Sequence, residues 1–210
     1  MTASSSALEL VYLDDALLVA NKPAGLLAVP GRGEDKQDCL SSRLQQEFPD
    51  ALVVHRLDMS TSGLMVFARG TETQRRLSRM FHDREVEKRY IAVVAGKLDS
   101  AGEIDLPIAA DWPNRPLRKI DAVNGKPALT RYRLLSYDAA SNTSRAELEP
   151  VTGRTHQLRL HLAAIGHPIL GDALYGDVAT APRLLLHASA ICLAHPLSGA
   201  PLNLFNEPPY

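Results

Sequence analysis

The chain has 210 residues, of which 45% are hydrophobic and 22% charged, and its formal net charge is −1 at pH 7. This length suits one large domain or a compact pair of half-domains. No apolar run approaches about 18 residues, and MTASSSALEL at the N-terminus has no basic or apolar region, so the sequence predicts neither a membrane span nor a secretion signal. Cys39 and Cys192 lack C-x-x-C spacing, which argues against zinc or disulfides and suits a reducing cytoplasm.

The near-neutral net charge conceals two basic segments. Residues 69–89 carry seven bases and four acids, and residues 112–133 carry six bases and one acid, whereas residues 1–50 carry eight acids and four bases. Such segments could bind the phosphates of a nucleic acid, or they could be solvated faces of the protein. Charge alone leaves both interpretations open.

The first elements in chain order are a hairpin, a loop and a helix. Residues 8–23 (LELVYLDDALLVANKP) are typical of two β-strands that turn at Asp14 and Asp15, and a loop rich in glycine and proline follows over 23–36. Apolar residues recur at four-residue spacing over 40–48, which predicts an amphipathic helix that Pro49 ends.

A buried strand and a second helix follow. The apolar run GLMVFA (63–68) predicts the strand. Thr71 and Gln74 have the spacing of a capping box, so we expect a helix from Thr71 to about residue 83. Its apolar face would bury three side chains, those of Leu77, Met80 and Phe81.

The second half of the chain predicts more strands than helices. KRYIAVVAG (88–96) reads as a strand, and residues 102–128 as an irregular excursion with short extended pieces. Residues 129–151 predict a hairpin, residues 152–168 a helix, and residues 183–196 a last apolar strand. This order favours an α+β fold with a mixed, mainly antiparallel β-sheet core and flanking helices and loops.

Two segments and one tyrosine are candidates for chemistry. In HRLD, Arg56 and Asp58 would share one side of an extended chain, so Asp58 is either a nucleophile or base, or the partner of Arg56 in a structural ion pair. A turn over residues 60–63 could hold this carboxylate through its N–H groups. In GRTHQLRLH, Arg154 precedes a helix and could reach a carboxylate or phosphate. Tyr90 is either a core residue or a stacking platform for a base.

The two histidines of this second segment give little support for a metal site. His156 and His161 are five residues apart and share no helix face, and H-E-x-x-H is missing. Both are instead candidates for cap or core groups, His161 more than His156. The sequence also lacks the glycine-rich phosphate-binding motifs and G-x-S-x-G of serine hydrolases.

Taken together, four segments resemble the RluA-type family of RNA pseudouridine synthases. They are HRLDMSTSGLMVFA (55–68), KRYIAVVAG (88–96), GRTHQLRLH (153–161) and RLLLHA (183–188), and the resemblance spans about residues 10–205. It implies one catalytic domain over 1–210 without a separate N-terminal RNA-binding domain. DWPNRP (111–116) and GKPA (125–128) look like members that isomerise uridines in stem-loops of both large-subunit (23S-type) rRNA and the tRNA anticodon arm.

The resemblance also implies roles for single residues. Asp58 would be the essential catalytic group, Tyr90 would stack on the uracil, and Arg154 would pair with Asp58. The uridine must be flipped out of its stack, and Arg56 would then fill the vacated space or hold its phosphate. Further contacts with RNA are expected from a set of five side chains, His55, Arg115, Arg118, Lys119 and Leu158. The reaction implies an RNA partner and no metal or other cofactor. We also expect a monomeric enzyme in the cytoplasm, without membrane association.

Two other functions are alternatives to an RNA-modifying isomerase: a non-catalytic RNA-binding protein and a hydrolase. A non-catalytic RNA-binding or RNA-folding protein could use the same fold, although binding alone would not require Asp58, Tyr90 and Arg154 together. A hydrolase of nucleosides or glycans would need a second carboxylate near Asp58. The candidates by sequence lie at a basic helix end, and they are Asp83, Glu85 and Glu87.

Overall fold

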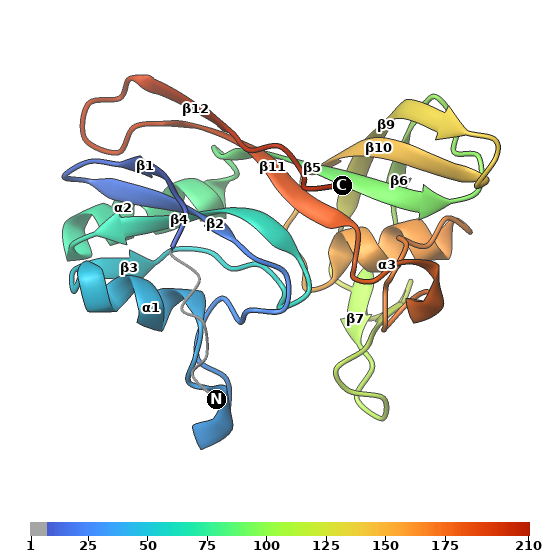
Figure 1. Cartoon of the computed structure of the whole chain (residues 1–210), viewed down its shortest axis with the longest axis horizontal. Coiled ribbons are helices and arrows are strands. Elements are labelled where there is room, and N and C mark those ends of the chain that lie inside the picture. Colours follow the sequence, from blue (N-terminus) through green and yellow to red (C-terminus); the bar gives the residue numbers. More distant parts are fainter. Residues whose placement is uncertain (1–7) are drawn as a thin grey trace. The chain divides into compact units, whose positions relative to one another are not determined.

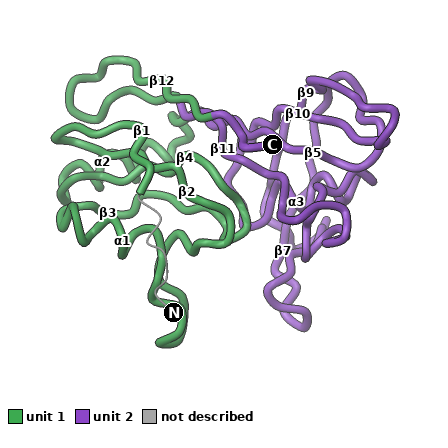
Figure 2. The backbone as a smooth tube through the Cα atoms, viewed as in Figure 1, with its two compact units in different colours: residues 1–86, 192–206 green, residues 87–191, 207–210 purple. Residues whose placement is uncertain are grey.

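The computed structural model describes residues 8–210. The N-terminal stretch that was predicted to lack a secretion signal covers residues 1–10, and its first seven residues lie outside the described residues. The chain divides into two compact units (Figure 2). Unit 1 comprises the residues up to Val86 together with Cys192–Asn206, and unit 2 comprises Glu87–Ile191 and Glu207–Tyr210. The single catalytic domain expected from the sequence stays a prediction. Among the described helices, none has the length and apolar character needed to cross a membrane.

Unit 1 combines a sheet with two helices (Figure 1). The pairs β1–β2, β2–β4 and β3–β4 are antiparallel, and β12 pairs with β11 (Leu186–Ala194). Helix α1 contacts β3, and α2 contacts β3 and β4. The bounds of these elements are β1 Leu10–Leu13, β2 Leu17–Lys22, β3 Ala51–Val53, β4 Ser62–Arg69, β12 Pro201–Phe205, α1 Leu40–Glu47, α2 Thr71–Asp83 and the short 3-10 helix η1 Glu34–Lys36.

The core of unit 1 lies around β2 and β4, as their apolar sequences require. Every residue of β4 except Arg69 is buried, which confirms the predicted buried strand. Helix α2 begins at Thr71 as predicted, but the capping box is wrong. Its N-cap is Gly70, without a side-chain cap, because the Gln74 amide donates instead to the carbonyl of Val53 at 3.0 Å.

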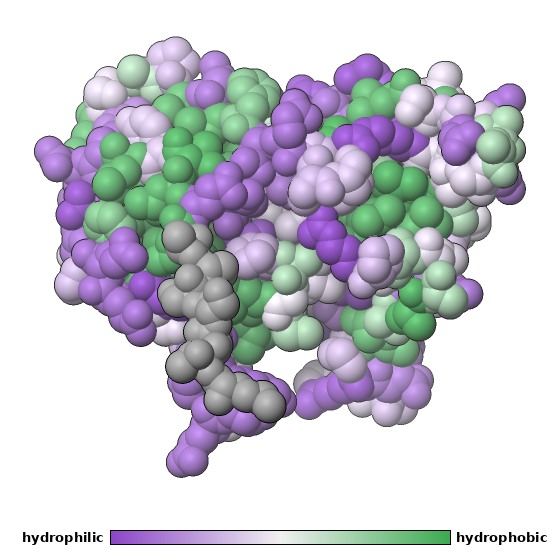
Figure 3. Space-filling model, viewed as in Figure 1, coloured by the Kyte–Doolittle hydropathy of each residue, from purple (hydrophilic) through white to green (hydrophobic). Residues whose placement is uncertain are grey.

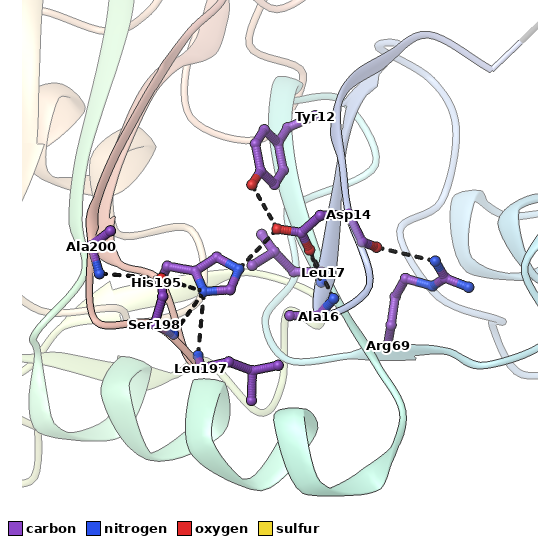
Figure 4. A network of polar contacts seen from close by, with 9 residues as sticks. All are labelled: Tyr12, Asp14, Ala16, Leu17, Arg69, His195, Leu197, Ser198 and Ala200. Carbon is purple, nitrogen blue, oxygen red and sulfur yellow. Dashed lines mark hydrogen bonds and ion pairs between the residues drawn. The ribbon is translucent and has the colours of Figure 1, made fainter.

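A polar network closes the end of unit 1 where the β1–β2 turn lies (Figure 4). The Asp14 carboxylate accepts hydrogen bonds from the Tyr12 hydroxyl at 2.6 Å and from His195 Nε2 at 2.8 Å. It also caps its own turn by accepting the N–H groups of Ala16 and Leu17. Burial raises the pKa of Asp14, but these hydrogen bonds outweigh it and lower the pKa to about 2. The network therefore ties the first hairpin to the segment after β11.

Unit 2 contains further sheet strands and one α-helix, α3. Its strands follow the order β11-β5-β10-β9-β6, and the pairs β5–β10, β9–β10 and β6–β9 are antiparallel, which confirms the predicted fold class. The antiparallel pair β7–β8 forms a separate two-stranded sheet. The bounds are β5 Glu87–Ala95, β6 Ala101–Asp105, β7 Ile108–Ala110, β8 Arg118–Ile120, β9 Leu129–Asp138, β10 Thr143–Pro150, β11 Leu186–Ala194, α3 Gln157–Ala164 and η2 Val178–Thr180.

Candidate functional site

The HRLD segment lies in the loop between β3 and β4 of unit 1. The strand β3 ends at Val53, so Asp58 lies in the loop, five residues beyond the paired strand. The carbonyl of Asp58 accepts the N–H of Thr61 at 3.1 Å, so the turn begins at Asp58, earlier than expected, and residues 62 and 63 already belong to β4. Asp58 is half-buried and Arg56 is exposed. The loop therefore presents a carboxylate at the rim of the core, with a guanidinium nearby in solvent.

Lys22 fixes the backbone beside Asp58, although it lies in none of the motifs identified in the sequence. It ends β2 and is fully buried, with 0% of its surface exposed. Its Nζ donates to three carbonyls, those of Pro23 at 2.8 Å, Leu26 at 2.7 Å and Met59 at 3.0 Å. The Met59 carbonyl also accepts the N–H of Gly25 at 2.8 Å. One buried cation thus fastens the residue after Asp58 to the loop that follows β2.

The charge of Lys22 is coupled to that of Asp58. Burial lowers the pKa of Lys22 from 10.5 to about 8, and the negative charge of Asp58 partly opposes this by favouring the ammonium form. At neutral pH about nine-tenths of Lys22 is therefore protonated.

His55 anchors the start of the same loop. Its Nε2 accepts the N–H of Val66 at 2.8 Å, and its ring stacks on Phe81 of α2 with a centroid distance of 4.4 Å. One ring nitrogen and one ring face of His55 are therefore engaged in contacts that stabilise the fold of unit 1. The role of His55 in RNA binding stays a prediction.

In unit 2, Arg154 lies directly before α3. Its Nε donates to the carbonyl of Pro127 at 3.1 Å, so the GKPA segment supports the guanidinium. Its terminal nitrogens have no hydrogen-bond partner within the described part of the chain. The Arg154 N–H and the Thr152 hydroxyl both donate to Oε1 of Gln157, at 3.0 and 2.7 Å. Gln157 therefore shapes the loop that presents Arg154.

Gln157 and His161 belong to the core rather than to a surface site. The Gln157 amide donates to the carbonyl of Leu129 and to the Thr130 hydroxyl, at 2.9 and 3.0 Å. That hydroxyl lies 3.0 Å from His161 Nδ1, and His161 Nε2 lies 2.9 Å from the carbonyl of Leu106. His161 is fully buried, and burial lowers its pKa. The prediction of a core role for His161 is confirmed.

His156 belongs to a second cluster, centred on Tyr175. The Tyr175 hydroxyl lies 2.9 Å from His156 Nδ1 and accepts the N–H of Arg118 in β8 at 2.8 Å. The Arg159 guanidinium lies over the Tyr175 ring and forms a two-pronged ion pair with Asp172, at 2.8 and 2.6 Å. Burial raises the pKa of Asp172, but Arg159 outweighs it and lowers the pKa. This cluster connects α3 to the β7–β8 hairpin.

Tyr90 and Leu158 both contact the core of unit 2. Tyr90 lies on β5 opposite Leu148 of β10, is half-buried, and packs against the core cluster. Leu158 is 7% exposed and belongs to that cluster. At these positions the two side chains could form the apolar floor of a binding site, rather than an isolated contact on the surface. The predicted roles of both residues in substrate binding stay predictions.

The three basic residues predicted to bind RNA all lie on the β7–β8 hairpin or its loop. Arg115 stacks on Trp112, with its guanidinium carbon 3.5 Å from the ring centroid. Lys119 forms an ion pair with Asp121 at 3.4 Å. Arg118 Nε is buried and has no hydrogen-bond partner among residues 8–210. The structure thus gathers these residues on one hairpin, and their contact with RNA stays a prediction.

Alternative chemistry finds little support in the described residues. Asp83 lies at the exposed end of α2, where His82 and Arg79 lower its pKa, so it is not a second carboxylate raised in pKa by an apolar pocket. No group of three or more histidine, cysteine, aspartate or glutamate residues in the described range has the arrangement of a metal site.

A serine–histidine–aspartate arrangement in unit 1 is also unsuited to hydrolysis. The Ser198 hydroxyl lies 3.0 Å from His195 Nδ1, and His195 Nε2 contacts Asp14. However, the same Nδ1 accepts the N–H groups of Leu197 and Ser198. Its lone pair is therefore engaged by backbone donors and cannot serve as a general base, so this network stabilises a turn (Figure 4).

Comparisons with known proteins agree with the motifs. The family model described as RNA pseudouridylate synthase matches residues 16–164. The "Dual-specificity RNA pseudouridine synthase RluA" of Escherichia coli (strain K12) is 50% identical over 196 residues, which cover 91% of this chain and 89% of that protein. The protein of the same name from Yersinia pestis is 48% identical over 197 residues, covering 92% and 95%.

A solved structure agrees as well. "Human RNA Pseudouridylate Synthase Domain Containing 1" matches with a TM-score of 0.81 and 30% identity, covering all of this chain and 87% of that one. Both the sequence matches and this structural match extend over most of each chain, so the resemblance predicted from the motifs is confirmed.

Proposed function

Because the chain belongs to the RNA pseudouridylate synthase family and is therefore an isomerase, we propose that it converts specific uridines to pseudouridine in stem-loops of large-subunit rRNA and of the tRNA anticodon arm. The proposal of two RNA classes rests on the DWPNRP and GKPA segments and on the name "dual-specificity" of its relatives. We further propose that the enzyme acts as a monomer in the cytoplasm, without a cofactor.

The observation that carries this proposal is the support of the Asp58 loop. Isomerisation breaks the bond between uracil N1 and ribose C1′ and forms one between C5 and C1′. The proton that C5 loses is balanced by the one that N1 gains, so neither water nor a redox partner is consumed. A carboxylate held at a fixed position can attack C1′, add to C6 or remove a ribose proton. Lys22 and Gly25 both hold the Met59 carbonyl, and that fixed backbone suits each of these roles for Asp58.

The other residues of the proposed site act on binding and orientation. Tyr90 stacks on the flipped uracil, because its ring lies at the edge of the unit 2 core. Arg154 is the proposed partner of Asp58, a role that rests on the GRTHQLRLH motif. Arg56, which is exposed, occupies the space left by the flipped base or holds its phosphate.

The test is tritium release from uridine C5 in a labelled anticodon stem-loop and in a ribosomal hairpin. We expect release with the native protein and none with Asp58→Asn, while both proteins bind the RNA equally in a fluorescence-anisotropy titration. Asp15→Asn is the matched control, since Asp15 is an exposed aspartate of the same unit, and it should behave like the native protein.

Each outcome of this test separates the candidate functions. Binding without release from either RNA by the native protein would favour the non-catalytic RNA-binding protein. Free uracil among the products would indicate a hydrolase. Release that persists in Asp58→Asn would refute the role given to Asp58. Normal binding and modification by Arg56→Ala would refute the role given to Arg56.

A further inference from the structure

The loop at the end of the β7–β8 hairpin carries an exposed tryptophan. Trp112 is 68% exposed even though the Arg115 guanidinium stacks on it at 3.5 Å from the ring centroid. The hairpin projects from the rest of unit 2 (Figure 1), and its end is coloured mainly as hydrophilic in Figure 3. A tryptophan in such a position gains little from the core of the protein, so its large apolar surface is available to a partner.

The loop holds this stacked pair in a defined shape. The Asn114 N–H donates to the Asp111 carbonyl at 3.2 Å, and the Asn114 side chain donates to the Asp111 carboxylate at 3.0 Å. The N–H groups of Leu117 and Asp111 donate to the carbonyls of Asn114 and Leu117, at 2.9 and 3.1 Å. Both ends of the loop are thus closed by hydrogen bonds, which reduces the entropy lost when the pair binds a ligand.

The hairpin is also rooted in the body of unit 2. The Arg118 N–H donates to the Tyr175 hydroxyl, and Ile108 packs with Ala128 and with Leu160 of α3. Ile120 packs against the same cluster. A ligand stacked at the end of the hairpin would therefore be held at a fixed distance from α3.

The charges around the pair identify the partner as nucleic acid. Between residues 108 and 127 the hairpin carries four bases, Arg115, Arg118, Lys119 and Lys126, and two acids, Asp111 and Asp121. Both acids are already engaged within the hairpin, Asp111 by Asn114 and Asp121 by the N–H groups of residues 123 and 124. Lys119 pairs with Asp121, so Arg115 and the exposed Lys126 remain to attract phosphates, and an exposed aromatic ring stacks on any base.

We propose that Trp112 and Arg115 form a stacking subsite for a second unpaired base of the substrate RNA, a base other than the uridine that is isomerised. This inference rests on the proposed function, in which the target uridine stacks on Tyr90. Trp112 supplies the stacking face, and Arg115 holds the ring in place and contributes positive charge next to the base.

The chain contains a single tryptophan, so intrinsic fluorescence reports on Trp112 alone. We expect saturating stem-loop RNA to quench this fluorescence, and an abasic substitution at one loop position outside the target to remove most of the quenching. Anisotropy of end-labelled RNA shows independently that the protein is saturated. Unchanged tryptophan emission in a saturated complex would overturn the proposal.

Kinetics give the second test. Trp112→Ala should raise KM for the stem-loop about 10-fold and leave kcat unchanged, and Trp112→Phe should retain most of the affinity. Phe205→Ala is the matched control, because Phe205 is also 68% exposed but lies on β12 of unit 1. With RNA abasic at the identified position, native protein and Trp112→Ala should have the same KM. A persistent 10-fold difference would assign Trp112 to the fold of the loop and overturn the proposal.

These results are distinguishable from failure of the proposed function. Pseudouridine formation with no effect of Trp112 on emission or KM would remove only the subsite. Quenching that depends on one loop base, in a protein that forms no pseudouridine in any RNA tested, would keep the subsite and remove the proposed function.

Discussion

Replacement of Lys22 by methionine tests whether the buried ammonium positions the Asp58 loop. Methionine has a similar length and keeps the apolar contacts of the side chain, but it cannot donate to the carbonyls of Pro23, Leu26 and Met59. The Met59 carbonyl would retain only the N–H of Gly25. The residue after Asp58 would thus lose its connection to the end of β2.

The expected loss of stability is the difference between two large terms. Three hydrogen bonds from a charged donor contribute roughly 5–9 kcal/mol in total. Retention of the buried proton at neutral pH opposes this by about 3 kcal/mol, because the pKa of Lys22 falls from 10.5 to about 8. We therefore expect Lys22→Met to lower the free energy of unfolding by about 2–6 kcal/mol, measured by urea denaturation.

The effect on activity should be larger on kcat than on KM. A catalytic group displaced by about 1 Å can lose about 100-fold in rate. The basic residues proposed to bind RNA are untouched, so KM should change by less than about 3-fold, in steady-state tritium-release assays of the folded variant. Lys36→Met, at an exposed lysine of unit 1, is the matched control and should leave both constants unchanged.

The pH dependence of the free energy of unfolding shows whether Lys22 acts through its ammonium charge or only through the volume of its side chain. The folded pKa of Lys22 is lowered, so the unfolded chain binds more protons between pH 8 and 10.5 and the native state gains stability as the pH rises. Relative to Lys22→Met, the native protein should become more stable by about 1 kcal/mol from pH 7 to pH 9. A flat difference, or an unchanged kcat in a folded Lys22→Met protein, would refute the positioning role.

The remaining predictions concern unit 2, unit 1 and RNA binding in turn. Asp172→Asn leaves a buried guanidinium without its charge partner and should lower the free energy of unfolding by about 3–5 kcal/mol in urea; a loss below 1 kcal/mol would contradict this. The pKa of Asp14 is lowered from 3.8 to about 2, so its contribution is present above pH 3.8 and is lost as the pH falls through 2. Asp14→Asn should thus cost about 1 kcal/mol at pH 7, reduced by partial solvent screening, and nearly nothing at pH 2. The affinity for RNA should fall steeply with salt, and Arg115→Gln should flatten that slope in anisotropy titrations; an unchanged slope would remove Arg115 from the phosphate contacts.

The strands were predictable where one local signal sufficed. The sequence of β10 alternates with a period of two residues, which is typical of a strand with one buried face. The sequence of β4 is an uninterrupted apolar run, which is typical of a fully buried strand. Both predicted strands form. The capping box at Thr71 was wrong because Gln74 can bond either to its own helix or to a distant carbonyl. In the folded chain it bonds to Val53, 21 positions earlier, and a local pattern does not reveal that competitor.

In the candidate site too, residues marked by a local motif were predictable, and residues defined by distant contacts were not. Asp58 and Arg154 were found because they sit in specific motifs, whereas Lys22 and Tyr175 were not. The partners of Lys22 include Met59, which is 37 positions away, and Tyr175 contacts Arg118, which is 57 positions away. The one available signal was a lysine at the end of a mainly apolar strand, a position where a charge requires partners.

The GRTHQLRLH segment identifies the family, yet most of its polar side chains serve the fold. Gln157 and His161 are bound within the core, and Arg159 is paired with Asp172, so none of the three is available to substrate. Only Arg154 has terminal nitrogens without partners in the described residues. A protein that had lost catalysis but kept this fold would still need the first three residues. The presence of this segment therefore argues for the architecture. Under the proposed function, the carboxylate of Asp58 on its fixed loop is what would separate an isomerase from an RNA-binding protein of the same fold.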